Sequence, residues 1–314
     1  ELEVCLSGAN IEQPGETTIP AKKAADIIRE LPEGQVSFEL NEESSKLTVK
    51  SSSGKYNLST IPGSDFPDFD VIKSDTTHKI TPNKLYELFL KTSFAMANQD
   101  WRHYLNGCLF EKTGSSINMV ATDAHRLAIY KSNLEGEGDF TGIVPRKTVI
   151  ELMKILPKQE DEIEFYINSN NIVFMSKKFT FKSKLIDGNY PNYNQVVPQG
   201  EGSKITFNRK NMLDSLSRVS VLTSEKFKGV KLKTESGVLD ISAHNPDQES
   251  AEEKLDVTSA GNEFDIAFNV NYLKEVLGTI DEEEISLISF GSDKSALVES
   301  GDSNQVLVLM PLLL

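Results

Sequence analysis

The chain contains few cysteines and few histidines. Among its 314 residues are two cysteines, Cys5 and Cys108, and four histidines. Two cysteines in a chain of this length form neither a disulfide framework nor a zinc cluster, and a reducing cytoplasm is the expected location. No His-x-x-x-His or Cys-x-x-Cys spacing occurs. The sequence therefore predicts no structural metal site and no cofactor.

Long apolar runs are also missing. A membrane helix needs about 18 or more apolar residues. The longest apolar stretch, "VLVLMPLLL", is shorter than that and is interrupted by Pro311. The first residues, "ELEVCLSGAN", lack the basic and then apolar regions of a secretory signal. They also lack an initiator Met, so we expect the chain to begin partway through a longer protein.

Positive charge is scarce overall but is concentrated in a few segments. The chain has 33 basic and 47 acidic residues, a formal net charge of −14, which argues against a general DNA-binding protein. Helical apolar spacing predicts helices at residues 20–31, 81–97, 145–156, 208–222 and 270–280. These segments hold 12 basic and 6 acidic residues, so the rest of the chain carries −20. The charged face of any one of these helices is interpreted as an ordinary solvated surface. Because similar helices recur, the alternative of a mildly basic surface that contacts phosphates without reading bases stays open.

Three segments of the chain share one plan. They start at Ile19, Val144 and Phe268, and each has a helix pattern, a turn and alternating strands. Pro20 and Pro145 lie 125 positions apart, so the period is that of a domain repeat. A full repeat reads as two helices and about eight strands, segregated along the chain, which is typical of an α+β fold with antiparallel sheets. We expect domains at residues 1–73, 74–200 and 201–314, the first lacking its front half, with "ELEVCLS" matching the strand that follows "TDAH".

The stretch "VATDAHRLAIY" raises the question of catalysis. It places Asp123, His125 and Arg126 within four positions, between two apolar runs. It reads as a strand, a tight turn and a second strand, in which the Asp and His side chains would alternate sides. No G-x-S-x-G motif occurs. We therefore expect no catalytic residues and an Asp123 that caps the turn. A hydrolase or metal enzyme that uses Asp123, His125 and His244 remains one alternative, and a protein-binding scaffold that does not bind DNA is another.

Longer motifs occur in order along the whole chain: "ATDAHRLA", "VPRKTVIELMKIL", "SKLIDGNYPNYNQVVP", "NPDQESAEE" and "VLMPLLL". Together they resemble the bacterial sliding clamp family, the beta subunit of DNA polymerase III. The resemblance implies a DNA-clamp fold in which two chains form a head-to-tail ring of six similar domains, with helices lining the hole. It also implies a non-catalytic processivity factor that encircles duplex DNA independently of sequence. Such a clamp tethers the polymerase III alpha subunit, the clamp loader and other proteins that carry a clamp-binding motif.

By the same resemblance, three sets of residues carry the function. The residues expected to face DNA are Lys22, Lys23, Arg29, Gln99, Arg102, His103, Tyr104, Arg146, Lys147, Lys154, Lys210 and Arg218. The residues expected to line a peptide groove between the second and third domains are Leu105, Thr122, Ala124, His125, Arg126, Leu127, Pro191, Val196, Asn269, Tyr272, Val308, Leu309, Met310, Pro311 and Leu312. The residues expected at the ring contact are Tyr56, Leu58, Val221 and Leu222.

The expected groove chemistry follows from these residue types. Apolar walls accept Leu and Phe side chains, each worth about 1.5–3 kcal/mol when buried. Met310 can repack around different partners, and Thr122 and Arg126 would donate hydrogen bonds to a peptide. Without the resemblance, the terminal apolar run is read as a plain core strand.

The chain departs from the family pattern at several positions. Ala124 replaces a common Gly, so a turn with positive φ would be strained. Gln195 and Leu313 stand where Arg is frequent, which makes the groove less basic. His103 and Tyr104 replace a Tyr-Tyr pair. Because half of the first domain is missing, we expect a weak dimer or monomer for this chain and a closed ring for the longer protein.

Overall fold

The computed structural model describes residues 1–6, 8–67, 76–226, 228–260 and 265–312. These residues form two compact units, one of Cys5–Ile72 and one of Glu1–Val4 with Lys73–Leu314. The expected domain boundary at residues 73 and 74 lies outside the described residues, as does Leu313. Within the described part of the chain, no helix is long and apolar enough to cross a membrane.

The described residues of the smaller unit form one α-helix and two small sheets. Its core comprises Ala24 from the helix and Leu47, Val49 and Leu58 from the strands. The helix begins after Pro20, whose fixed φ suits a helix start. The elements are β2 (Thr17–Thr18), α1 (Ala21–Glu30), β3 (Ser37–Asn41), β4 (Lys46–Lys50), β5 (Lys55–Ser59) and β6 (Ile61–Pro62). The strands pair β3-β4-β5 and β2-β6, which leaves β5 at an edge of its sheet.

The larger unit contains two consecutive copies of one element order. The first copy comprises β7 (His78–Ile80), α2 (Pro82–Leu90), β8 (Gly107–Thr113), β9 (Ser116–Thr122), β10 (Arg126–Asn133), β11 (Phe140–Pro145), α3 (Arg146–Ile155), β12 (Ile163–Ile167), β13 (Asn171–Met175) and β14 (Phe179–Lys184). The second comprises β15 (Ser203–Asn208), α4 (Arg209–Val219), β16 (Gly229–Glu235), β17 (Val238–His244), β18 (Ser250–Asp256), β19 (Thr258–Ala260), β20 (Asp265–Asn269), α5 (Val270–Gly278), β21 (Glu284–Ser289), β22 (Ala296–Glu299) and β23 (Gln305–Leu309). These elements confirm the predicted α+β class.

Strand order shows the repeat in three dimensions. The first copy has the row β11-β8-β9-β10 and the second has the matching row β20-β16-β17-β18. The first also has β14-β13-β12-β7, which corresponds to β23-β22-β21-β15. The copies join where β10 pairs antiparallel with β23, which makes a nine-stranded sheet. In the same way, β1 (Leu2–Val4) pairs antiparallel with β14, so β1 takes the place that the sequence assigned to "ELEVCLS".

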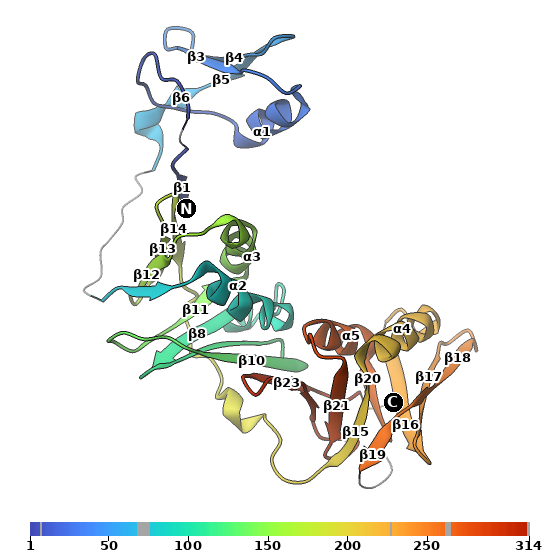
Figure 1. The fold of residues 1–314 in the computed structure, drawn as a ribbon. Coiled ribbons are helices and arrows are strands. Elements are labelled where there is room, and N and C mark those ends of the chain that lie inside the picture. Colours follow the sequence, from blue (N-terminus) through green and yellow to red (C-terminus); the bar gives the residue numbers. More distant parts are fainter. Residues whose placement is uncertain (7, 68–75, 227, 261–264, 313–314) are drawn as a thin grey trace. The chain divides into compact units, whose positions relative to one another are not determined.

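Helices cover one face of the joined sheet. Figure 1 shows the pair α2 and α3 and the pair α4 and α5 on the same side of the nine-stranded sheet. The main core lies beneath them and includes Leu307 and Leu309 of β23. Val308 points to the opposite face, where a second cluster contains Leu127 and Tyr193. The alternation along β23 follows from the two-residue period of a strand.

The predicted helices agree with the observed ones except at one end. The segment at residues 81–97 is helical only to Leu90 and then forms a short 3₁₀ turn, Ser93–Ala95. The hydroxyl of Thr92 donates to the carbonyl oxygen of Leu88 at 2.7 Å, a local bond of the kind that competes with helix continuation. The apolar spacing continued through the turn, which is why it was predicted as helix.

Candidate functional site

The turn between β9 and β10 is held by the Asp123 carboxylate. Its Oδ1 accepts hydrogen bonds from the backbone N–H groups of His125 at 2.9 Å and Arg126 at 3.0 Å. The hydroxyl of Thr122 accepts from the N–H of Ala124 at 3.1 Å and donates to the carbonyl oxygen of Arg126 at 2.6 Å. Ala124 has a φ of 74°, which costs about 1–2 kcal/mol for a residue with a Cβ. The four hydrogen bonds offset that strain, so Asp123 serves the turn.

Arg126 is buried and joins the two copies of the repeat. Its Nε donates to Asp123 at 3.1 Å, its Nη2 donates to the carbonyl oxygen of Phe94 at 2.6 Å, and its Nη1 donates to Glu275 of α5. The guanidinium carbon lies 4.5 Å from the ring centre of Tyr272. Arg126 is 7% exposed. Internal partners thus use the Thr122 hydroxyl and three of the five N–H donors of Arg126, so the expected donation from Arg126 to a peptide is left to its other two N–H groups.

A second buried cation lies at the same junction. Lys91, at the end of α2, donates to the carbonyl oxygen of Thr279 at 2.7 Å and to the carboxylate of Asp281 at 2.6 Å. Both acceptors follow α5. Two cations from the first copy thus bind to α5 and to the segment that follows it. The junction has a fixed geometry, as a preformed binding surface requires.

The predicted groove residues come together along this junction. Leu127 faces Val308 across the β10–β23 pair, and both are buried. Beside them, Val196 is 49% exposed and Met310 is 38% exposed. The backbone N–H of Met310 donates to the carbonyl oxygen of His125 at 2.8 Å, which fixes the terminal segment against the turn. The result is an apolar strip with a buried base and exposed margins.

The remaining groove candidates divide into margin and core. The ring of His125 stacks on Tyr272 with centres 5.8 Å apart, and Asn269 caps α5 by accepting from the N–H of Tyr272 at 3.3 Å. Ala124 and Pro191 are exposed, and Pro311 and Leu312 are half-buried. Leu105 is buried. Leu309 belongs to the main core beneath the helices and faces away from the strip, so its assignment to the groove wall is not supported by its position.

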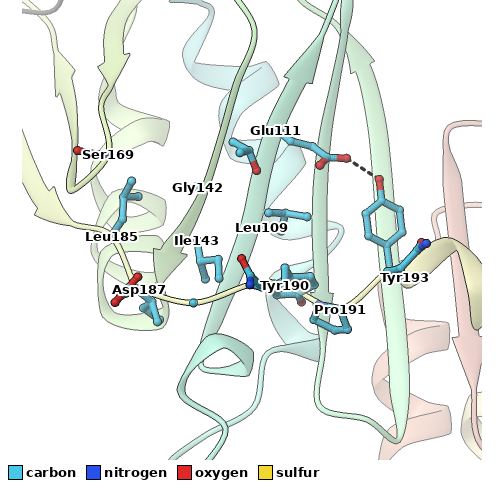
Figure 2. Close-up of a pocket in the computed structure, with 15 residues that line it drawn as sticks. Leu109, Glu111, Gly142, Ile143, Ser169, Leu185, Asp187, Tyr190, Pro191 and Tyr193 are labelled. Atoms are coloured by element: carbon cyan, nitrogen blue, oxygen red, sulfur yellow. Dashed lines mark hydrogen bonds between the residues drawn. The ribbon is translucent and has the colours of Figure 1, made fainter.

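A pocket of about 390 Å³ adjoins the strip (Figure 2). The segment 185–193 forms one wall, and its other walls come from β8 and β11. Pro191 lines the pocket and is also a groove candidate. The hydroxyl of Tyr193 donates to the carboxylate of Glu111. Burial and this bond raise the pKa of Tyr193 to about 12, so the phenol keeps its proton into the alkaline range and the segment stays tied to β8.

The side chains of the enzyme alternative do not form a catalytic group. The Asp123 carboxylate is occupied by the turn and by Arg126, and the His125 ring stacks on Tyr272. His244 ends β17 and pairs with Ser250. Across the described ranges, no three His, Cys, Asp or Glu side chains lie close enough together to hold a metal ion.

The candidate DNA-facing residues lie on the helices and on the loop before β8. Lys22, Lys23 and Arg29 are on α1, Lys147 and Lys154 are on α3, and Lys210 and Arg218 are on α4; all are exposed. Gln99 and His103 are exposed, and Arg102, Tyr104 and Arg146 are half-buried. Several of these cations have carboxylate partners: Arg29–Asp26, Arg102–Asp100, Lys154–Glu151, Lys210–Asp214 and Arg218–Glu253. Surface pairs of this kind are worth about 0–1 kcal/mol, so phosphates can displace them.

The ring-contact candidates lie near two free sheet edges. Tyr56 of β5 is 38% exposed, and Val221, after α4, is 78% exposed. Leu222 is half-buried. Leu58 is 5% exposed and belongs to the core of the smaller unit, so its side chain is not free for an external contact. Strand β5 ends the three-stranded sheet, and β18 ends the four-stranded sheet.

Sequence reasoning missed the partners of the buried cations. Glu275 lies 149 positions from Arg126, and Asp281 lies 190 positions from Lys91. No local pattern links residues so far apart. The one available signal was an Arg at the start of an apolar strand, because a buried Arg needs a counter-ion.

Comparison with known proteins gives one consistent result. Family models of the DNA polymerase III beta subunit match the chain in three parts: the N-terminal domain at residues 1–70, the central domain at 79–192 and the C-terminal domain at 194–313. The chain is 39% identical over 319 residues to the Beta sliding clamp of Pseudomonas aeruginosa, covering 99% of this chain and 87% of the relative. It is 39% identical over 317 residues to the Beta sliding clamp of Escherichia coli (strain K12), with 99% and 86% covered.

A solved structure agrees with these sequence relatives. The crystal structure of the DNA polymerase III subunit beta from Pseudomonas aeruginosa superposes with a TM-score of 0.91 at 38% identity. The match covers 100% of this chain and 86% of the other.

Proposed function

The chain belongs to the family of the bacterial DNA polymerase III beta subunit, the beta sliding clamps, and we propose that it encircles duplex DNA and receives partner peptides on the apolar strip at the β10–β23 junction. It is a non-catalytic processivity factor of DNA replication. The observation that carries the peptide site is the register of Leu127 with Val308, which unites candidate residues from two copies of the repeat. The cytoplasmic location expected from the cysteine count stays a prediction.

The DNA contact is supported by where the cations lie. The helices α3 and α4 carry exposed Lys and Arg, although the whole chain has a net charge of −14. A tether that must slide needs dispersed, screened phosphate contacts and no base readout. The acidic remainder of the surface disfavours a second DNA site. We propose that the twelve DNA candidates named above supply these contacts.

Ring closure is supported by the repeat itself. In the first copy β10 pairs with β23, and β1 pairs with β14 by the same rule. The equivalent strand of the second copy, β18, is at a sheet edge, and β5, the equivalent of β14 and β23, is at another edge. Pairing of β18 from one chain with β5 of a second chain would complete the pattern. A homodimer ring follows, with the polymerase alpha subunit and the clamp loader as proposed partners.

The peptide site is tested by titrating a labelled Gln-Leu-x-Leu-Phe peptide into the chain. Replacing Met310 with Ala should weaken binding by about 2 kcal/mol, because the peptide loses an apolar contact at the margin of the strip. Val221→Ala removes an exposed apolar group away from the strip and serves as the control. Identical titration curves for the wild type and Met310→Ala would remove the pocket assignment.

The DNA function has a separate test. After loading, the protein should stay on circular DNA and be lost from linear DNA by sliding off the ends. Equal loss from both would favour the scaffold that binds proteins only.

A further inference from the structure

The loop between α2 and β8 holds its tip in a fixed shape. The N–H of Ala97 donates to the carbonyl oxygen of Leu105 at 3.0 Å. The N–H of Asp100 donates to Oδ1 of Asn106 at 2.9 Å, and Nδ2 of Asn106 donates back to the carbonyl oxygen of Asp100 at 2.8 Å. Bonds across the base of a loop restrict its motion, so a side chain at the tip is presented in one place.

The side chain at that tip is Trp101, the only tryptophan of the chain. It is 81% exposed. The guanidinium carbon of Arg102 lies 5.7 Å from the ring centre of Trp101. Arg102 is itself fixed, because its Nε and Nη2 donate to the two carboxylate oxygens of Asp100 at 3.0 and 2.9 Å. A large aromatic ring held in water on a rigid support, beside a cation, indicates a partner that covers it.

The charges around Trp101 favour a polyanion. The start of α3 is bonded to the same loop: the N–H of Arg146 donates to the carbonyl oxygen of Asn106 at 2.9 Å, and its Nη1 donates to that of Met96 at 3.2 Å. Lys147 follows and is exposed. Asp100 and Arg102 form an ion pair that adds no net charge, so Arg146 and Lys147 supply the positive charge of this rim. A cationic rim with an exposed aromatic ring is the combination by which proteins bind single-stranded nucleic acid.

We propose that Trp101 stacks on an unpaired base where the bound duplex gives way to single-stranded DNA. Bases inside a duplex are covered by their neighbours, so an aromatic side chain can stack only where a base face is open. The contact would hold the clamp at a primer–template junction, whereas the phosphate contacts let it slide. The inference rests on the proposed DNA contact of the helices.

The sole tryptophan is also the reporter. The 314-residue chain is titrated with a short duplex that has an oligothymidylate overhang and with the same duplex bearing blunt ends. Tryptophan emission and the anisotropy of labelled DNA are read in parallel. Emission should be quenched by the overhang duplex only. The overhang should raise affinity about tenfold, the size of one base–aromatic stack.

Matched variants identify the cause. Trp101→Ala should abolish the gain from the overhang, Trp101→Phe should keep most of it, and both should unfold like the wild type because the ring is exposed. Phe66→Ala, which removes a ring that is 66% exposed in the smaller unit, should leave the gain unchanged.

The outcomes separate the two claims. Equal binding of both duplexes with unchanged emission overturns the stacking and leaves the DNA surface standing. Binding of neither duplex overturns both. Quenching by the Gln-Leu-x-Leu-Phe peptide but not by the overhang would assign Trp101 to partner proteins and overturn the proposal.

Discussion

Strands β10 and β18 occupy the same position in two copies of one repeat, yet their sequences differ in kind. Strand β10 begins "RLAIY", and all five of these residues are buried. Strand β18 reads "SAEEKLD" and alternates between exposed and half-buried residues. The first pairs on both sides, with β9 and β23, and among the described residues the second pairs only with β17. A strand buried on both faces needs a continuous apolar run, whereas an edge strand needs charge to resist aggregation.

The ion pairs at the two positions differ in the same way. Arg126, at the start of β10, is buried among Asp123, Glu275 and Tyr272. The pair Arg218–Glu253 at β18 joins a side chain that is 61% exposed to one that is 24% exposed. Removing one partner of a buried ion pair leaves the other charge buried without a counter-ion. Removing one partner of an exposed pair leaves a charge that water can solvate. The permanent junction and the free edge should therefore respond differently to the same substitution.

The largest effect is expected at Arg126. Replacing Arg126 with Met should lower the free energy of unfolding by about 3 kcal/mol, because Asp123 and Glu275 lose their shared cation. Arg218→Met makes the same chemical change at the free edge and should cost less than about 1 kcal/mol. Urea unfolding followed by circular dichroism measures both. Equal losses for the two variants would contradict the distinction between junction and edge.

The next largest effect is expected at Tyr193, which ties the segment 185–193 to β8. The raised pKa of Tyr193, about 12, stabilises the fold below pH 10 and ceases to do so as pH rises from 10 to 12. Between pH 10 and 12 the tyrosine of the unfolded chain releases its proton, while Tyr193 of the folded chain stays neutral beside Glu111. The free energy of unfolding therefore falls as pH rises through this window. Tyr193→Phe should flatten part of the alkaline decline, by about 1 kcal/mol. A variant and a wild type that decline in parallel from pH 10 to 12 would show that Tyr193 does not titrate as described.

At the free edge, association is the quantity to measure. Val221→Asp should weaken self-association of the chain about tenfold, because it places a charge where an apolar contact is proposed. Val196→Asp alters an exposed valine at the strip and should leave self-association unchanged while it weakens peptide binding. Sedimentation equilibrium reads the first effect. Unchanged association of Val221→Asp would remove that residue from the proposed ring contact.

Sequence periodicity predicted most of the fold, but the site was predicted only in part. The apolar spacing placed all five helices, and the recurring prolines gave the repeat, because both signals are local or periodic. The Asp123 turn was predicted for the same reason. Leu309 and Leu58 were assigned to surfaces but lie in cores, since one residue of shift along a strand changes the face. The partners of Arg126 and Lys91 depend on how the two copies of the repeat meet, which no single repeat encodes.

The smallest effect is expected for DNA binding by helix α3. Helix α3 and helix α5 are equivalent in the repeat, but α5 turns Glu275 and Tyr272 toward the junction, while α3 keeps Lys147 and Lys154 exposed. Replacing Lys147 with Gln should weaken DNA binding equally for all sequences and reduce the salt slope by about 1, the share of one phosphate contact. Lys204→Gln, in strand β15 and paired with Glu299, is the control that should change neither quantity. A loss that depended on DNA sequence would mean that α3 reads bases, and a surface that reads bases would stop at its preferred sites, which is incompatible with a clamp that slides.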